Sequence, residues 1–142
     1  MILTLTDITS CVIFDRQDVF YPHMVQPTDP DNLLPLAVAT FHILVAVADQ
    51  DRHGYAIMQD VATRTNGALK LSPGTLYGSI RRMLDEGLIV ELSDRQRPEE
   101  DDERRRYYRI TPFGRSVAQA EAARLATLLR QAKAVGLTPG RA

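Results

Sequence analysis

Two helix-start signals restrict the fold of this chain more than any other feature of its sequence. Ser72-Pro73 and Thr111-Pro112 each place a hydroxyl side chain directly before a proline. Serine or threonine at that place accepts a hydrogen bond from an unpaired backbone N–H, and proline suits the first helical position because its fixed φ is already helical. The sequence therefore predicts helices that begin at residues 73 and 112.

Two β-prone runs lie between these two signals. Residues 88–92 and 106–110 are rich in β-branched and aromatic side chains, and the polar residues 93–105 separate them. This separation is longer than a tight hairpin turn and fits an extended wing. Because Tyr107 and Tyr108 are neighbours in a strand, they are expected on opposite faces, with at most one of them in the core and the other displayed at the surface.

Helical periodicity predicts two further helices before the first signal. Apolar residues recur at helical spacing over residues 36–47, and a second apolar stripe covers residues 54–65. His53 is expected to be a turn or helix-cap residue, and Gly87 is expected to end the helix that starts at residue 73. The order helix, helix, helix, strand, wing, strand is that of a winged helix-turn-helix domain, which is mainly α with a small β-hairpin.

The last predicted helix is long and amphipathic. Alanine and leucine recur along one side of it for about six turns, and an apolar face of that length needs a cover. A second copy of the helix is the simplest cover, so the protein is expected to be a homodimer. The residues expected at the dimer contact, or around an effector bound between the two helices, are Leu125, Leu128, Leu129 and Ala132.

The chain divides into four predicted parts. Residues 1–34 contain several prolines and no clear periodicity, and they are expected to form a poorly ordered N-terminal arm. Residues 35–111 form the winged-helix domain, residues 112–135 the dimerisation helix and residues 136–142 a tail.

Composition excludes several classes of protein. The single cysteine, Cys11, leaves no pair for an intramolecular disulfide or a cysteine-based zinc site, and no apolar run reaches the roughly 20 residues of a membrane span. No phosphate-loop glycine pattern, nucleophile elbow or paired metal-ligand motif is present. The sequence therefore predicts a cytoplasmic protein without membrane contact, metal, cofactor or enzymatic activity.

Charge is distributed unevenly although the net charge is only −1. Residues 99–103 are all acidic, whereas residues 104–115 contain five arginines and no acid. DNA repels the first run and attracts the second. Our hypothesis is that the acidic run forms a wing tip bent away from DNA while the arginines at the wing base follow the phosphates; a solvated, flexible loop is the alternative.

Three segments together resemble the PadR family of transcriptional regulators. They are residues 53–57 (HGYAI), 71–77 (LSPGTLY) and 104–111 (RRRYYRIT), the last followed by Gly114. In that family the winged helix binds DNA, the long C-terminal helix makes the dimer, and the usual function is repression relieved by a small molecule. The resemblance implies the same fold and partners for this chain, with a single C-terminal helix as in the short members.

The candidate DNA contacts fall into two groups. Thr75, Ser79 and Arg82 lie away from the apolar face of the helix that starts at residue 73, and Arg82 suits the paired acceptors of guanine. A solvated helix face is the alternative for this group. The phosphate contacts are expected from a helix N-terminus, two tyrosine hydroxyls and the wing base: Lys70, Ser72, Gly74, Thr75, Tyr55, Tyr77, Arg104, Arg105 and Arg106. A plain helix cap is the alternative for Ser72, and core packing is the alternative for the tyrosines.

These patterns predict a sequence-specific regulator of transcription that binds double-stranded DNA. It acts as a homodimeric repressor on a pseudo-palindromic operator, because two related recognition helices address two related half-sites. A small-molecule effector relieves the repression. The alternative is a dimeric winged-helix module that binds a ligand or a protein and has no affinity for DNA, and the acidic run and the net charge of −1 favour that alternative.

Overall fold

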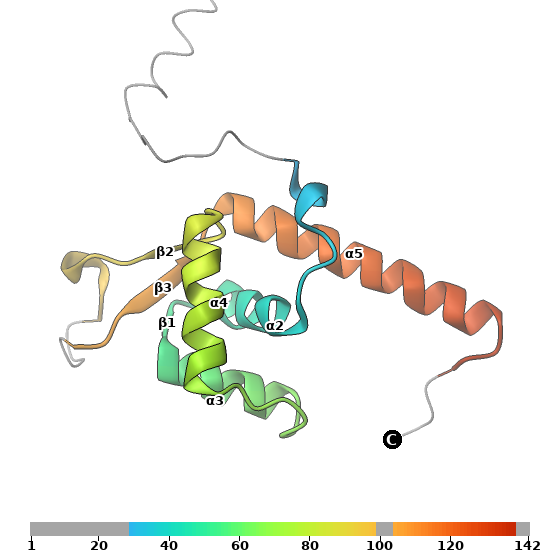
Figure 1. Cartoon of the computed structure of the whole chain (residues 1–142), viewed down its shortest axis with the longest axis horizontal. Helices are drawn as coiled ribbons and strands as arrows, with labels where there is room; N and C mark the ends of the chain where they lie inside the picture. The colour runs from blue at the N-terminus through green and yellow to red at the C-terminus, as the bar shows by residue number, and fades with distance from the viewer. Residues whose placement is uncertain (1–28, 99–103, 139–142) are drawn as a thin grey trace, which may run out of the picture.

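The computed structural model describes residues 29–98 and 104–138 (Figure 1). Helix α2 (Val38–Asp49) lies at the centre, with α3 (Gly54–Arg64) and α4 (Pro73–Asp85) packed against it. Helix α5 (Pro112–Ala134) packs on α2 with its first half and extends beyond the rest of the molecule with its second half. The four helices confirm the four that the sequence predicted.

The hydrophobic core forms around α2. Ile43, Leu44 and Ala46 are completely buried because α3, α4, α5 and the sheet all pack on this one helix. Burial of a side chain such as Ile43 or Leu44 contributes about 1.5 to 3 kcal/mol relative to its exposure, so α2 contributes several kcal/mol to the stability of the domain. The surrounding helices contribute completely buried residues that include Ile57, Val61, Leu76, Met83 and Val117.

A small antiparallel sheet flanks the helices. Its strand order is β1 (Arg52–His53), β3 (Tyr107–Ile110) and β2 (Ile89–Glu91), with β3 in the centre. The register pairs His53 with Tyr107 and Ile89 with Ile110. The predicted class, mainly α with a small β-hairpin, is confirmed. The sequence did not predict β1, because a strand of two residues is too short to produce a recognisable β pattern.

The prediction that only one of Tyr107 and Tyr108 is buried is wrong. Tyr108 packs in the core and is 3% exposed, while Tyr107 on the other face of β3 is 8% exposed. The His53 ring lies edge-on to the Tyr107 ring, with centroids 5.2 Å apart and an interplanar angle of 88°. Because β1 brings His53 next to β3, the outer face of the central strand is covered as well.

Side-chain caps begin three of the helices. His53 Nδ1 accepts from the Ala56 N–H (3.2 Å) at α3, and Ser72 Oγ accepts from the Thr75 N–H (3.1 Å) at α4. Thr111 Oγ1 accepts from the Gly114 N–H (2.9 Å) at α5. A positive φ of 74° at Gly87 follows the end of α4. The cap and stop predictions are therefore confirmed.

The second half of α5 extends beyond the domain and exposes its apolar face to solvent. Val117 and Glu121 are buried, whereas Leu125, Leu128 and Leu129 are exposed, so the exposed apolar face that the sequence predicted is present on the single chain. The 3₁₀ helix η1 (Pro30–Leu33), which falls inside the predicted arm, packs on α5. In the part of the chain that the structure describes, no helix is both long and apolar enough to cross a membrane.

Candidate nucleic-acid interface

Helix α4 turns one face to the core and another to solvent. Leu76, Ile80 and Met83 are buried in the core. Thr75 and Arg82 are exposed, whereas Ser79 is only partly exposed because it lies at the edge of the apolar face. Thr75 and Arg82 are therefore displayed as the sequence predicted, and Ser79 is displayed less fully.

The N-terminus of α4 combines a cap with an open surface. Ser72 Oγ accepts from the backbone of Thr75 and donates to Thr75 Oγ1 (3.0 Å), so the structural role of Ser72 is established. An added Cβ on Gly74 would meet nothing closer than Ser72 Oγ at 3.9 Å, and the neighbouring Lys70 is exposed. Unpaired amides at a helix start carry partial positive charge, which suits a phosphate.

The start of α3 meets α4 through a glycine and a tyrosine. An added Cβ on Gly54 would lie 2.6 Å from the hydroxyl oxygen of Tyr77 and 3.0 Å from its Cζ. The close packing of the Tyr77 phenol against the α3 backbone therefore requires glycine at position 54. Tyr77 remains 52% exposed and Tyr55 59% exposed, so both rings contribute to the surface.

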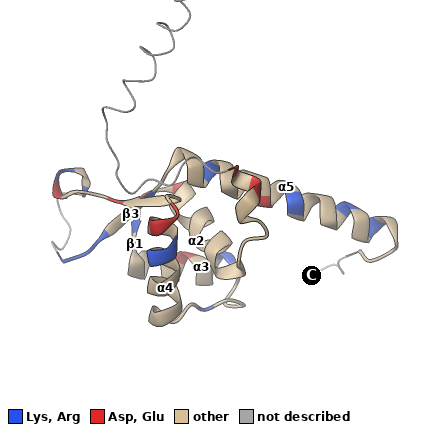
Figure 2. Cartoon of the chain, turned by 45° about the horizontal axis from the view of Figure 1, so that its top comes forward, with Lys and Arg blue, Asp and Glu red and all other residues tan. Residues whose placement is uncertain are grey.

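The described part of the wing is held together at its base. Arg97 Nη1 donates to the Arg105 carbonyl (2.7 Å), which ties the outgoing arm of the wing to the returning one, and Arg97 also pairs with Asp94. Arg106 lies 3.8 Å from Glu91 across the sheet. Figure 2 shows basic residues along the segment that leads into β3. The acidic run at 99–103, for which we predicted a tip bent away from DNA, lies outside the described residues.

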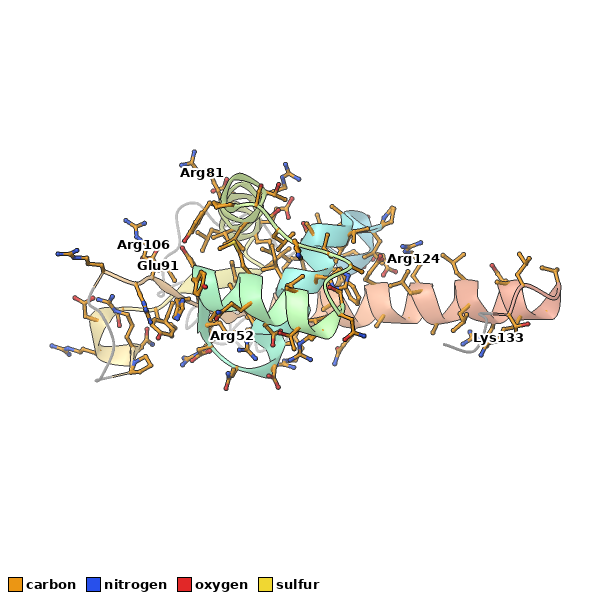
Figure 3. All side chains as sticks on the ribbon, turned by 90° about the horizontal axis from the view of Figure 1, so that it is seen from below. Arg52, Arg81, Glu91, Arg106, Arg124 and Lys133 are labelled. Atoms are coloured by element: carbon orange, nitrogen blue, oxygen red, sulfur yellow. The ribbon has the colours of Figure 1, made fainter. Side chains whose placement is uncertain are left out.

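These elements surround one open depression of 430 Å³. It is lined from α3, α4 and the wing by His53, Gly54, Tyr55, Tyr77, Arg104, Arg105, Arg106 and Tyr108. Burial, together with the nearby Glu91 carboxylate, raises the pKa of Tyr108, so its phenol stays protonated as a hydrogen-bond donor. In Figure 3, Arg106 and Arg81 lie at the end of the molecule opposite Lys133 on α5. The depression is thus a concave surface with cationic and hydroxyl side chains.

The five arginines in residues 104–115 have different environments. Arg104, Arg105 and Arg106 line the depression. Arg109 instead makes a paired contact with Asp51 (2.7 Å at the shortest), and Arg115 donates to the Ala48 carbonyl at the end of α2 (3.3 Å). The positive charge at the site therefore comes from the first three arginines.

A second group of ion pairs lies at the same, C-terminal end of α2. Arg52 and Arg64 both contact Asp49 and Asp60, at distances of 2.5 to 3.1 Å. These pairs tie the end of α2 to α3. They also neutralise these two arginines within the domain.

The structure brings together only part of the predicted site. Tyr55 and Tyr77 meet Arg104, Arg105 and Arg106 around the depression, while Lys70, Ser72, Gly74 and Thr75 lie at the N-terminus of α4. Sequence reasoning missed His53 and Tyr108 as lining residues. His53 adjoins Gly54 and Tyr55 in the sequence, and that adjacency was the available signal; the contribution of Tyr108 depends on the packing of β3. The predicted dimer residues lie apart on α5.

The fold and this surface define a winged-helix protein of the DNA-binding class. The model of the transcriptional regulator PadR-like family matches residues 43–120. The chain belongs to this family, which confirms the resemblance seen in the sequence.

Known relatives agree with this assignment. The chain is 33% identical over 95 residues to transcriptional regulator Rv3488 of Mycobacterium tuberculosis, covering 67% of this chain and 82% of the relative. A PadR family transcription regulator from Clostridium difficile has a TM-score of 0.57 and 22% identity, covering 70% of this chain and 98% of that one. A transcriptional regulator from Clostridium thermocellum has a TM-score of 0.58 and 23% identity, covering 67% and 86%. The two solved structures are similar in fold.

Proposed function

We propose that the protein is a homodimeric repressor that binds a pseudo-palindromic DNA operator and is released from it by a small-molecule effector. The observation that carries the proposal is the depression, in which the starts of α3 and α4 and the arginines of the wing base meet. In a winged helix these elements straddle a DNA groove, with α4 as the recognition helix in the major groove.

Base recognition is assigned to the exposed face of α4. Arg82 has a guanidinium whose two parallel N–H groups match the O6 and N7 acceptors of guanine. Thr75 is exposed near the start of the helix, and Ser79 lies between them at the edge of the apolar face. These three side chains provide the sequence-dependent part of binding.

Phosphate contacts are assigned to the surface around α4. Tyr55 and Tyr77 present their rings at the surface, and their hydroxyls donate to phosphate oxygens. The remaining contacts come from the helix start and the wing base, through Lys70, Ser72, Gly74, Thr75, Arg104, Arg105 and Arg106. Such contacts provide most of the affinity and its dependence on salt.

Dimerisation is assigned to the second half of α5. Leu125, Leu128 and Leu129 are exposed on the single chain, and Ala132 follows on the next turn. A symmetric pair of helices buries this apolar face and places two copies of α4 on two half-sites, about one helical turn of DNA apart. The effector binds in the apolar space between the paired helices, because clefts at such interfaces hold small ligands.

A DNA titration over a range of salt concentrations tests the proposal. Fragments selected from sheared genomic DNA provide the specific site. If a dimer neutralises about six phosphates, the slope of log affinity against log salt is near −5. A flat salt response rejects DNA binding as the function. If the dimer persists while the chain binds no DNA, the result favours a winged-helix module for a ligand or protein.

The Arg82→Ala variant separates base contacts from phosphate contacts. We expect it to weaken specific binding about tenfold or more and unrelated DNA much less, since a bidentate base contact contributes about 1 to 3 kcal/mol of discrimination. Arg130→Ala is the matched control, because Arg130 is exposed on α5 and hydrogen-bonds Thr127 on the same helix. Equal losses on both DNAs would reassign Arg82 to a phosphate contact.

The dimer is tested by placing a charge on α5. Leu128→Glu is expected to yield a monomer in sedimentation equilibrium, because a carboxylate at the centre of an apolar contact remains unpaired. Val90→Glu on β2 is the matched control, since Val90 is 45% exposed and Leu128 is 47% exposed. A Leu128→Glu protein that remains dimeric would rule out this face of α5 as the interface.

A further inference from the structure

Arg81 is an exposed arginine in the second half of α4. The buried residues of this helix are Leu76, Ile80 and Met83. Successive residues of an α-helix lie about 100° apart around its axis, so Gly78 stands opposite the buried face. Arg81 and Arg82 lie on either side of Gly78, at about 40 to 60° from it. The outermost part of α4 is therefore a glycine between two arginines.

The side chains of these two arginines are available to a ligand. Neither Arg81 nor Arg82 makes a side-chain hydrogen bond or an ion pair with any other residue that the structure describes. Arg52, Arg64 and Arg109, by contrast, pair with aspartates. A guanidinium has five N–H donors and no acceptor, so each of the two exposed groups offers all five to a partner outside the domain.

The surface between the two arginines is open. An added Cβ on Gly78 would meet nothing within 4 Å, and Gly78 is not among the glycines with a positive φ. Side chains on a helix lean toward its N-terminus, so both arginines extend toward the turn that contains Gly78. Figure 3 shows Arg81 directed away from the body of the domain. A duplex can therefore come close to the backbone of α4 here, with one arginine on each side.

We infer that Arg81 reads a guanine of the operator, on a different base pair from the one that Arg82 reads. The inference rests on the proposed function and deepens it, since it adds a second specificity-determining arginine to α4. The outermost residues of a helix in the major groove face the base edges, and Arg81 is displayed there more fully than Ser79. One arginine in a bidentate contact occupies both O6 and N7 of its guanine, so the second arginine requires another base.

The variant Arg81→Gln tests this contact through a change of base preference. A glutamine amide matches the N7 acceptor and N6 donor of adenine, as a guanidinium matches the two acceptors of guanine. In selection from a random duplex library, we expect one position of each half-site to lose its preference for guanine by about fivefold or more and to shift toward adenine. An equal loss on all sequences, with a salt slope smaller by about 0.9 per protomer, would reassign Arg81 to a phosphate and overturn the inference.

Two control variants show whether the change belongs to Arg81 alone. Arg82→Gln is expected to change the preference at another position of the half-site, and Arg130→Gln on α5 is expected to change none. Arg81→Gln should unfold at the same urea concentration as the wild type, because the side chain is exposed and has no partner in the described part of the chain. If Arg81→Gln and Arg82→Gln change the same position, the two arginines do not read separate base pairs and the inference fails.

A modified base identifies the guanine itself. 7-Deazaguanine lacks the N7 acceptor but keeps its pairing with cytosine, so it removes one of the two hydrogen bonds to an arginine. At one position of each half-site it is expected to weaken the wild type and Arg82→Ala about fivefold and to leave Arg81→Ala unaffected. Equal sensitivity of the wild type and Arg81→Ala at every position contradicts the contact. A wild type that selects no sequence from the library would instead reject the proposed function.

Discussion

Gly114 marks the place where the long helix leaves the domain, and its replacement by alanine tests how tightly that junction is packed. An added Cβ would lie 2.0 Å from the carbonyl oxygen of Leu88 and 2.8 Å from its carbonyl carbon. That carbonyl cannot swing aside freely, because it accepts from the Thr111 N–H at 3.0 Å and lies 3.1 Å from the Thr111 hydroxyl. Alanine therefore forces α5 and the residue-88 segment apart.

The expected cost of Gly114→Ala follows from these contacts. Forcing an extra methyl group into a packed site costs about 1 to 3 kcal/mol, and disturbance of the Thr111 cap adds up to about 1 kcal/mol. The higher helix propensity of alanine offsets about 1 kcal/mol of this. An added Cβ only 2.0 Å from a backbone oxygen places this site at the upper end of the first range, so we expect a net loss of about 2 to 3 kcal/mol in the free energy of unfolding.

Gly78→Ala provides the matched control on another helix. Gly78 lies inside α4, and an added Cβ would meet nothing within 4 Å. Alanine is expected to stabilise the protein there by about 1 kcal/mol, because only the propensity difference acts. The same chemical change thus has opposite signs at the two positions.

Urea unfolding followed by circular dichroism, at one fixed protein concentration, measures both effects. About 1 kcal/mol corresponds to roughly 4 °C in the melting temperature of a domain of this size, so a thermal scan also separates the two variants. A neutral surface substitution usually changes the free energy of unfolding by no more than about 0.5 kcal/mol. If the unfolding free energy of Gly114→Ala lies within this range of the wild-type value, the packing argument is refuted.

Three further predictions concern the site, the core and the dimer helix. Gly54→Ala should fold normally but weaken DNA binding several-fold in a salt titration, since its methyl group displaces the Tyr77 hydroxyl; unchanged affinity would contradict a DNA contact by this ring. Glu121→Gln should destabilise by about 1 kcal/mol at neutral pH. The Arg124 hydrogen bond lowers the pKa of the buried Glu121 on folding. The difference in unfolding free energy between the wild type and Glu121→Gln should therefore persist above about pH 4.3 and vanish as the pH falls through the lower folded-state pKa. A stability difference that grows in acid refutes this. The chain has no tryptophan, so Leu128→Trp should give emission that shifts to the red on dilution as dimers separate, and constant emission argues against burial there.

Local interactions explain why so much of the fold is predictable from the sequence. Ser72 and Thr111 each cap a helix through an N–H three residues away, and Gly87 ends α4 through its own positive φ. These contacts span a few residues, so the order of residue types already specifies them. The apolar face of α5 is predictable for the same reason, since it depends only on helical periodicity.

The tertiary structure decided the features that depend on distant partners. The pairing of β1 with β3 brings His53 beside Tyr107 and Arg105, more than 50 residues away, and that contact buries a tyrosine expected at the surface. Arg109 is as basic as its neighbours in the sequence, but it pairs with Asp51 and is not among the arginines that line the depression. Sequence determines which side chains can donate, cap or pack; which of them meet depends on strand register and helix packing, because these set the distances over which hydrogen bonds and ion pairs act.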